Sequence, residues 1–224
     1  NQNPKHIKQM NIYLCHPSRG RPDMAEDCIK DWKNKAQAPD KITHFLSLDN
    51  DDPSRTMYPK ADKTLTGDNA GMVEAINRLL PLCEDENGLL ITLYDDFSPP
   101  DRWDRWIAGL LKAKGPGVVF VDCCNPQLQT IQIGTVSIFK KWGYILHPKY
   151  ISMFSDNDFT SVSSEDSTWP NAGIFSYFDF TDQICSFTHE SRLMNYRSGT
   201  FKGADHEISS SLSHASRQCN DLLR

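Results

Sequence analysis

The chain has 224 residues, of which 38% are hydrophobic and 24% charged, and its formal net charge is −5. This length suits one compact domain, and the composition excludes a disordered chain. No apolar run approaches the ~20 residues that a membrane-spanning helix needs. The negative charge argues against a broad basic surface for nucleic acid, although it leaves room for a local basic groove. Seven scattered Cys residues without a CxxC pair exclude a zinc ribbon and indicate a reducing, cytoplasmic compartment.

The first half of the chain alternates between strand and helix patterns. Residues 1–10 are expected to form a polar tail and residues 11–224 a single domain. Apolar, β-branched runs predict strands at 11–15, 42–48, 89–94 and 117–121. Helical spacing predicts helices at 23–33, at 70–80, and from an N-cap at Ser98 to about Lys114. This alternation predicts an α/β fold with a largely parallel sheet between two helical layers.

The second half is less periodic. Residues 131–139 look extended, residues 140–145 look helical, and residues 155–159 look like an Asn/Asp-rich loop. A last strand is expected at 182–188 and a terminal helix at 204–223.

Carboxylates gather where the predicted strands end. The acidic residues that follow three strands are Asp49, Asp51 and Asp52, then Asp95 and Asp96, and finally Asp122. Ligands of open α/β sheets bind outside the carboxyl ends of the strands. Carboxylates gathered there attract a hard divalent cation, which in turn bridges to phosphates. A simpler explanation is also open, because Asp commonly ends strands and begins turns.

Several segments resemble one enzyme family. Residues 89–96, Leu-Leu-Ile-Thr-Leu-Tyr-Asp-Asp, followed by Phe-Ser-Pro-Pro, are similar to the DXD-type segment of GT-A-fold glycosyltransferases, particularly small family-2-like members of phages and bacteria. Residues 17–22 resemble the loop after the family's first strand, and residues 48–53 resemble the end of its second strand. Asn69-Ala-Gly71 with Asn77 resembles its glycine and asparagine motif. The resemblance covers roughly residues 12–159 and departs from the pattern at Tyr94, where many members carry the first Asp.

The resemblance implies a three-layer α/β/α GT-A fold, with a nucleotide-binding half at about 11–122 and an acceptor half at about 123–224. It implies transfer of a sugar from a nucleoside-diphosphate sugar, for which we expect a UDP-sugar, to an acceptor hydroxyl. The acceptor could be a glycan, a small molecule or a modified nucleic acid, and no membrane partner is expected. The implied cofactor is Mn²⁺ or Mg²⁺, which stabilises the leaving diphosphate as a Lewis acid.

The same resemblance implies roles for individual residues. Asp96 would bind the metal, with His189 as an additional late ligand. Residues implied to hold the donor are Pro17, Ser18, Arg19, Asp49, Asp51, Asn69 and Asp95. Arg19 and Arg21 could also pair with a diphosphate through their guanidinium groups. Solvated surface positions would explain both arginines equally well.

An inverting transfer also needs a general base. Asp156 and Asp158 are the catalytic candidates, because their segment resembles the acidic acceptor-side segment of the family; a solvated turn is the alternative reading. His16 and His44 lie in or beside predicted strands and are expected only to pack.

Two other functions fit the sequence less well. A nucleotidyltransferase would share the sheet and the metal, but it would show a Gly-rich first loop that Ser18-Arg-Gly-Arg21 imitates poorly. A non-catalytic module that binds sugar nucleotides is the second alternative. The dinucleotide GxGxxG and the P-loop GxxxxGK[ST] motifs are absent from the sequence.

Overall fold

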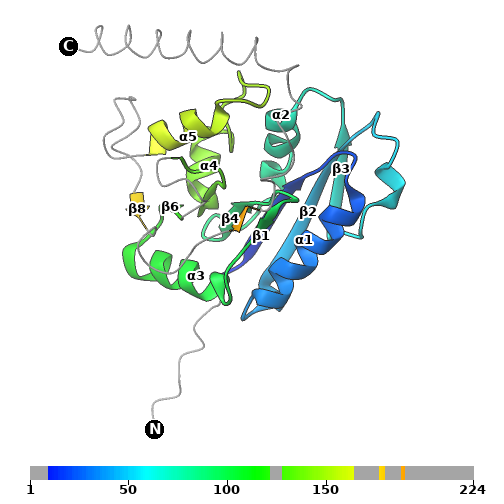
Figure 1. Cartoon of the computed structure of the whole chain (residues 1–224). Coiled ribbons are helices and arrows are strands. Elements are labelled where there is room, and N and C mark those ends of the chain that lie inside the picture. Colours follow the sequence, from blue (N-terminus) through cyan, green and yellow to red (C-terminus); the bar gives the residue numbers. More distant parts are fainter. Residues whose placement is uncertain (1–9, 122–127, 164–176, 180–187, 190–224) are drawn as a thin grey trace, which may run out of the picture.

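The computed structural model describes residues 10–121, 128–163, 177–179 and 188–189. Their central feature is a seven-stranded sheet with the order β3-β2-β1-β4-β7-β6-β8 (Figure 1). Its strands are β1 (Ile12–Pro17), β2 (Ile42–Asp49), β3 (Lys63–Gly67), β4 (Leu89–Thr92), β6 (Val118–Phe120), β7 (Ile133–Thr135) and β8 (Tyr177–Asp179). Only β7 runs against the others, since it pairs antiparallel with β4 and β6 while the other pairs are parallel. The predicted α/β fold with a mostly parallel sheet is confirmed.

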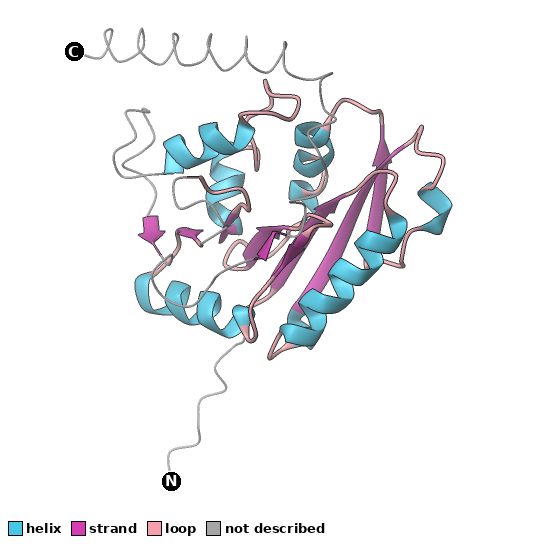
Figure 2. Ribbon diagram, viewed as in Figure 1, coloured by secondary structure: helices cyan, strands magenta, loops and turns pink. Residues whose placement is uncertain are grey.

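Helices cover both faces of this sheet (Figure 2). One face carries α1 (Pro22–Lys35) and α3 (Trp103–Lys114), and the other carries α2 (Met72–Asn77), α4 (Val136–Trp142) and α5 (Ser155–Ser163). Short 3-10 turns lie at η1 (Pro39–Lys41), η2 (Arg55–Met57) and η3 (Leu80–Leu82). This is the three-layer arrangement that the alternating pattern predicts.

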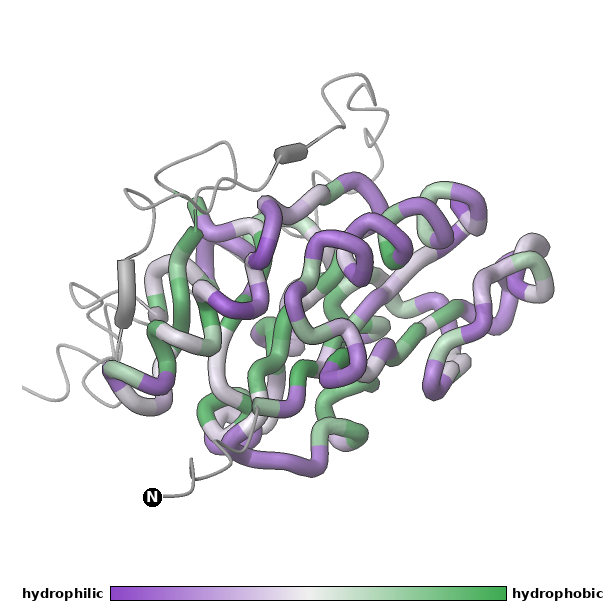
Figure 3. The backbone as a smooth tube through the Cα atoms, turned by 90° about the horizontal axis from the view of Figure 1, so that it is seen from below, coloured by the Kyte–Doolittle hydropathy of each residue, from purple (hydrophilic) through white to green (hydrophobic). Residues whose placement is uncertain are grey.

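The core consists of two clusters, one on each face. Along β1, Leu14 packs in the cluster under α1 and α3, whereas Tyr13 and Cys15 pack in the cluster under α2 and α4. Residues Leu89 to Thr92 of β4 are all buried, as expected of a parallel strand covered on both faces. Figure 3 shows the hydrophobic stretches concentrated in the central strands, with hydrophilic stretches outside them.

The region after β4 differs from its prediction. Helix α3 begins at Trp103, not after an N-cap at Ser98. Ser98 instead lies in β5 (Phe97–Ser98), which pairs antiparallel with β9 (Thr188–His189), and its hydroxyl donates to Asp31 at 2.5 Å. Arg102, at φ 59°, turns the chain into the helix. The expected N-cap at Ser98 was therefore wrong, although the helix ends at Lys114 as predicted.

Other elements also differ from their predictions. The extended pattern predicted at 131–139 stops at Thr135, where α4 begins, and this helix replaces the one expected at 140–145. The Asn/Asp-rich segment 155–159 is the start of α5 rather than a loop. Strand β3 lies in a stretch that has no strand in the prediction, and it is an exposed edge strand. Helix α2 is shorter than 70–80 because the chain turns into η3 through Pro81.

Some expectations lie outside the described residues. These are Asp122, most of the strand expected at 182–188, and the terminal helix expected at 204–223. In the described ranges, no helix is both long enough and apolar enough to cross a bilayer.

Candidate functional site

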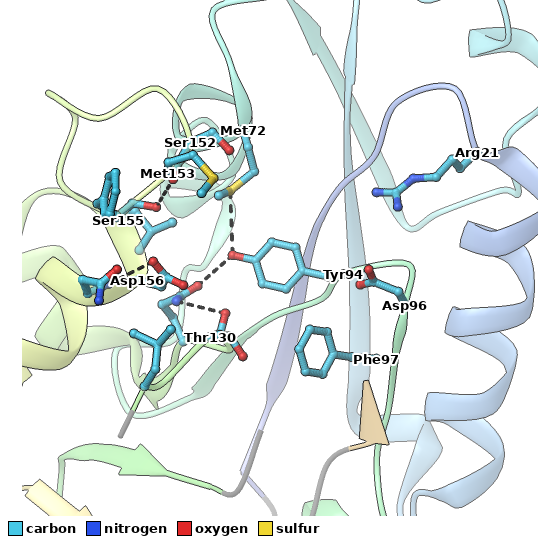
Figure 4. A pocket seen from close by; sticks show the side chains of 15 residues that line it. Arg21, Met72, Tyr94, Asp96, Phe97, Thr130, Ser152, Met153, Ser155 and Asp156 are labelled. Atoms are coloured by element: carbon cyan, nitrogen blue, oxygen red, sulfur yellow. Dashed lines mark hydrogen bonds between the residues drawn. The ribbon is translucent and has the colours of Figure 1, made fainter. Parts of the chain in front are cut away.

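Two adjoining cavities lie at the carboxyl ends of β1, β2 and β4. The smaller, about 230 Å³, is lined by the loop after β1 and by the N-terminal part of α2. Its polar lining consists of Ser18, Arg19, Arg21, Asp49, Asn69, Tyr94 and Ser152, with Pro17 beside them. The larger, about 430 Å³, is lined by residues that follow β4 and by α5, including Asp96 and Asp156 (Figure 4). The cavities share Arg21, Met72, Tyr94 and Ser152, so they adjoin along a common wall.

Arg19 organises the acidic end of β2. Its guanidinium lies 3.1 Å from Oδ2 of Asp49 and also binds both carboxylate oxygens of Asp51. The hydrogen bond from Arg19 lowers the pKa of Asp51, and Asn69 adds a weaker contact at 3.4 Å. Oδ1 of Asp49 is buried without a hydrogen-bond partner among the described residues. Asp49 thus contributes a carboxylate to the wall of the smaller cavity, and one of its two oxygens has an unused capacity to accept a hydrogen bond.

Asp52 holds the loop after β1 in place. Its carboxylate accepts hydrogen bonds from the backbone N–H of Gly20 at 2.9 Å and from the hydroxyl of Ser54 at 2.7 Å. Burial alone would raise the pKa of Asp52, but these bonds together lower it. Tyr58 adds a second tie, since its hydroxyl accepts from the backbone N–H of Arg21 at 3.1 Å.

Asp95 lies inside the protein at the centre of a hydrogen-bonded chain. Its Oδ1 is 2.7 Å from Nε2 of His16, and its Oδ2 accepts from the hydroxyl of Ser18 at 2.9 Å. Nη2 of Arg21 lies 3.0 Å from the same Oδ2. Nδ1 of His16 is in turn 3.1 Å from Nε2 of His44, whose pKa burial lowers to about 3.

This hydrogen-bonded network changes the interpretation of His16, His44 and Asp95. His16 and His44 were expected only to pack, but they support Asp95 from behind. The side chain of Asp95 is 0% exposed and lines neither of the two cavities. Direct contact between Asp95 and a donor would require the carboxylate to leave these partners.

Asp96 and Tyr94 line the larger cavity. Asp96 is partly exposed, and Figure 4 shows its carboxylate near Phe97 on the same wall as Tyr94. The hydroxyl of Tyr94 donates to Oε1 of Gln132 at 2.9 Å, which fixes the ring across the wall shared by the two cavities. Tyr94, the position at which the sequence departs from the DXD-type segment that it resembles, therefore forms part of the wall between the two cavities.

The backbones of the two predicted metal ligands lie near each other, since Asp96 immediately precedes β5 and His189 lies in β9. In the β5–β9 pair, His189 is in register with Phe97, the residue that follows Asp96. Among the residues whose placement is described, no group of three or more His, Cys, Asp or Glu side chains could hold a metal ion. A divalent ion held by one or two carboxylates and by substrate phosphates needs no such cage, so the carboxylate of Asp96 fits that mode of binding.

The two predicted general bases lie on different sides of α5. Residues two apart on a helix point in different directions, so only one of them can face a given cavity. Asp156 lines the larger cavity, and burial raises its pKa. Asp158 is 9% exposed and lines neither cavity, and burial raises its pKa to about 7. The geometry therefore favours Asp156 over Asp158 for a role at the cavity.

The glycine and asparagine motif shapes the wall between α2 and the segment before α5. Gly71 has φ +97°, and a Cβ there would lie 2.6 Å from the carbonyl oxygen of Ile151. The side chain of Asn77 accepts from the backbone N–H groups of Ile145 and Leu146, at 2.8 and 3.0 Å, and donates to the carbonyl of Leu146 at 2.7 Å. Asn69 and Gly71 line the smaller cavity, whereas Asn77 lies behind the wall and is structural.

Comparison with known proteins shows which fold this is. S. aureus TarS 1–349 in complex with UDP aligns with a TM-score of 0.59 at 12% identity, over 80% of this chain and 60% of that chain. The same TarS fragment in complex with UDP-GlcNAc aligns with a TM-score of 0.60 at 12% identity, over 82% and 61%. The mannosyltransferase PcManGT from Pyrobaculum calidifontis, in complex with GDP-Man and Mn²⁺, aligns with a TM-score of 0.63 at 12% identity, over 86% and 60%.

The chain thus spans about three fifths of the length of these structures. No protein-family model matches the sequence, and no curated protein matches it. The likeness establishes the GT-A-type, nucleotide-sugar-transferase fold that the resemblance implies.

Proposed function

We propose that this protein is a glycosyltransferase that binds a nucleoside-diphosphate sugar in the smaller cavity and transfers its sugar to an acceptor hydroxyl in the larger cavity. One observation carries the proposal. Five of the seven predicted donor residues line the smaller cavity, although they come from three separate segments of the chain: Pro17, Ser18, Arg19, Asp49 and Asn69. Asp96 and Asp156 line the cavity that adjoins it.

In this mechanism the nucleoside lies against the loop after β1 and the end of β2. The carboxylate of Asp49 accepts a hydrogen bond from the base or the ribose. Arg19 keeps Asp49 and Asp51 in place by bridging them. The expected donor is a UDP-sugar.

Asp96 is the residue that would hold Mn²⁺ or Mg²⁺, with His189 as a further candidate. The metal would neutralise charge that develops on the leaving diphosphate. In an inverting transfer, Asp156 accepts the proton of the acceptor hydroxyl as that oxygen bonds to the anomeric carbon. Its raised pKa makes it a stronger base than an ordinary Asp.

The acceptor belongs to the larger cavity. Its lining combines Tyr94, Phe97 and Phe154 with polar side chains such as Thr130 and Asn157. Aromatic faces and short polar groups suit a hydroxylated ligand such as a glycan or a small molecule. A cytoplasmic location is consistent with the buried free thiols of Cys15, Cys28 and Cys83.

A thermal-shift screen of UDP-, GDP-, CDP- and dTDP-sugars, each with and without Mn²⁺, tests the proposal. A ligand at 100 times its Kd should stabilise the protein by about 2.7 kcal/mol. We expect one nucleotide class to raise the Tm and to do so more strongly with metal. Slow release of the nucleoside diphosphate from that donor would support transferase activity. Release of pyrophosphate would indicate a nucleotidyltransferase instead, and binding without turnover would indicate a non-catalytic module.

A further inference from the structure

Arg21 occupies the boundary between the two cavities. It lines both of them, and its side chain is 36% exposed. Figure 4 shows its guanidinium pointing toward the side of the larger cavity where Tyr94 and Asp96 lie. A group that joins a ligand in the smaller cavity to a ligand in the larger one must pass this boundary.

The neighbouring Arg19 cannot provide the same free charge. Its guanidinium is bound by Asp49 and by both oxygens of Asp51, so two carboxylates already oppose its single positive charge. Arg21 has one ionic partner among the described residues, Oδ2 of Asp95 at 3.0 Å. A guanidinium carries five N–H groups, and this contact leaves an edge for bidentate binding of an anion.

The carboxylate that holds Arg21 is itself restrained. Ser18 donates to the same Oδ2, and His16 donates to Oδ1 from a fully buried position. His44 supports His16 from the next strand. His16 and Ser18 thus hold the two oxygens of Asp95, and the direction of the guanidinium is set by a carboxylate that is itself fully buried.

We propose that Arg21 binds the diphosphate of the donor and that Asp95 is a positioning residue that aims the guanidinium at it. The inference rests on the proposed function, since it assigns the phosphate-binding cation of that same site. A planar guanidinium with paired N–H groups matches phosphate oxygens in a bidentate geometry. The base and ribose would remain with Asp49 and the loop after β1.

Calorimetric titration of UDP and GDP, each compared with its nucleoside and carried out in EDTA, tests this assignment. We expect wild type to bind one diphosphate more tightly than the matching nucleoside. Arg21→Gln should weaken binding of that diphosphate by roughly 10- to 100-fold and leave the nucleoside unchanged. Arg21→Lys should give an intermediate loss, because it keeps the charge but not the bidentate edge. Arg105→Gln makes the same charge change at an exposed position of α3 and should affect neither ligand.

The outcomes separate the two proposals. If wild type binds neither nucleotide here and none of the four classes of sugar nucleotide in the thermal-shift screen with Mn²⁺, both the proposed function and this assignment fail. If wild type prefers the diphosphate and Arg21→Gln retains that preference, only the assignment of Arg21 is overturned. An equal loss of nucleoside and diphosphate affinity would also overturn it, because it would mean that the variant damages the whole cavity.

The role of Asp95 is tested by Asp95→Asn and by the double variant with Arg21→Gln. The amide keeps the shape of the carboxylate but loses its charge, so the guanidinium is no longer held. We expect Asp95→Asn to lower the ratio of diphosphate to nucleoside affinity. Adding Asp95→Asn to Arg21→Gln should lower this ratio no further than Arg21→Gln does alone. Fully additive losses would show that Asp95 acts independently of Arg21.

Discussion

Nε2 of His16 lies 2.7 Å from Oδ1 of Asp95, and both side chains are completely enclosed. A buried carboxylate is costly unless donors surround it, and here His16, Ser18 and Arg21 provide them. The core of the candidate site is therefore a polar network whose parts depend on one another.

Replacing His16 tests this dependence. His16→Leu keeps similar bulk but removes the donor to Asp95, and we expect it to lower the free energy of unfolding by about 2–3 kcal/mol. His16→Gln, whose amide can still donate, should recover part of the loss. Urea unfolding measures both. If the effect works through the buried charge, adding Asp95→Asn to His16→Leu should restore stability; a further loss would contradict this.

Asp96→Ala tests the metal assignment. Because Asp96 is partly exposed at the wall of the larger cavity, we expect the variant to fold normally. It should lose the extra stabilisation that Mn²⁺ gives to donor binding in a thermal-shift assay. Asp101→Ala, at an exposed position before α3, is the matched control. A full metal effect in Asp96→Ala would rule out this residue as the ligand.

Asp156→Asn separates the two candidate bases. The amide cannot accept the proton, so kcat should fall by about 10²- to 10⁴-fold while the donor KM stays the same. Hydrolysis of the stabilising sugar nucleotide, with water as the acceptor, provides an assay before the natural acceptor is known. Asp158→Asn should have a much smaller effect on kcat, since Asp158 does not line either cavity. The reverse order of effects would exchange their roles.

Asp158 should instead make stability depend on pH. Burial raises its pKa from 3.8 to about 7, so the folded state holds a proton that the unfolded state has lost across this range. The free energy of unfolding should therefore fall as the pH rises through that window, by on the order of 2–4 kcal/mol. Asp158→Asn should remove most of this slope and be more stable than wild type at pH 8. The exposed Asp101→Asn should leave the slope unchanged, and an unchanged slope in Asp158→Asn would contradict the prediction.

Two glycines offer a matched pair of stability tests. Gly71→Ala places a methyl group against Ile151 at φ +97°, and we expect a loss of roughly 2–4 kcal/mol. Gly109→Ala, in α3 with nothing within 4 Å of the added Cβ, should instead stabilise the protein by about 0.5–1 kcal/mol. Thermal unfolding of both variants checks the signs. Equal effects would mean that the backbone at Gly71 relaxes freely.

The sequence predicted most of the first half of the fold because the relevant signals there are local. Buried apolar runs identify β1, β2 and β4, and the carboxyl ends of parallel strands meet at one edge of the sheet. The gathering of Pro17, Asp49 and Asn69 at one cavity follows from that rule and from the family resemblance. The start of α3 was missed because β5 is held by β9, a partner more than 80 residues away in the chain.

The buried network was missed for a similar reason. A His within a strand pattern does not reveal whether its ring meets a carboxylate, since that depends on how β1 and the segment after β4 approach each other. The one available signal was the pair His16, just after the first predicted strand, and His44, within the second. Likewise, the Asn/Asp-rich composition of 155–159 suits a turn, but acidic residues also favour the first turn of a helix, as in α5.

The three hydrogen bonds of Asn77 join α2 to the segment that borders the larger cavity. The backbone N–H of Val73 adds a fourth link by donating to the carbonyl of Ile151 at 3.2 Å. The wall of the smaller cavity is thus continuous with the wall of the larger one. If the proposed function holds, reshaping α2 to change the donor would disturb the larger cavity as well. The loop after β1, which is anchored to Asp52 and Tyr58 instead, is therefore the better place to change the donor preference.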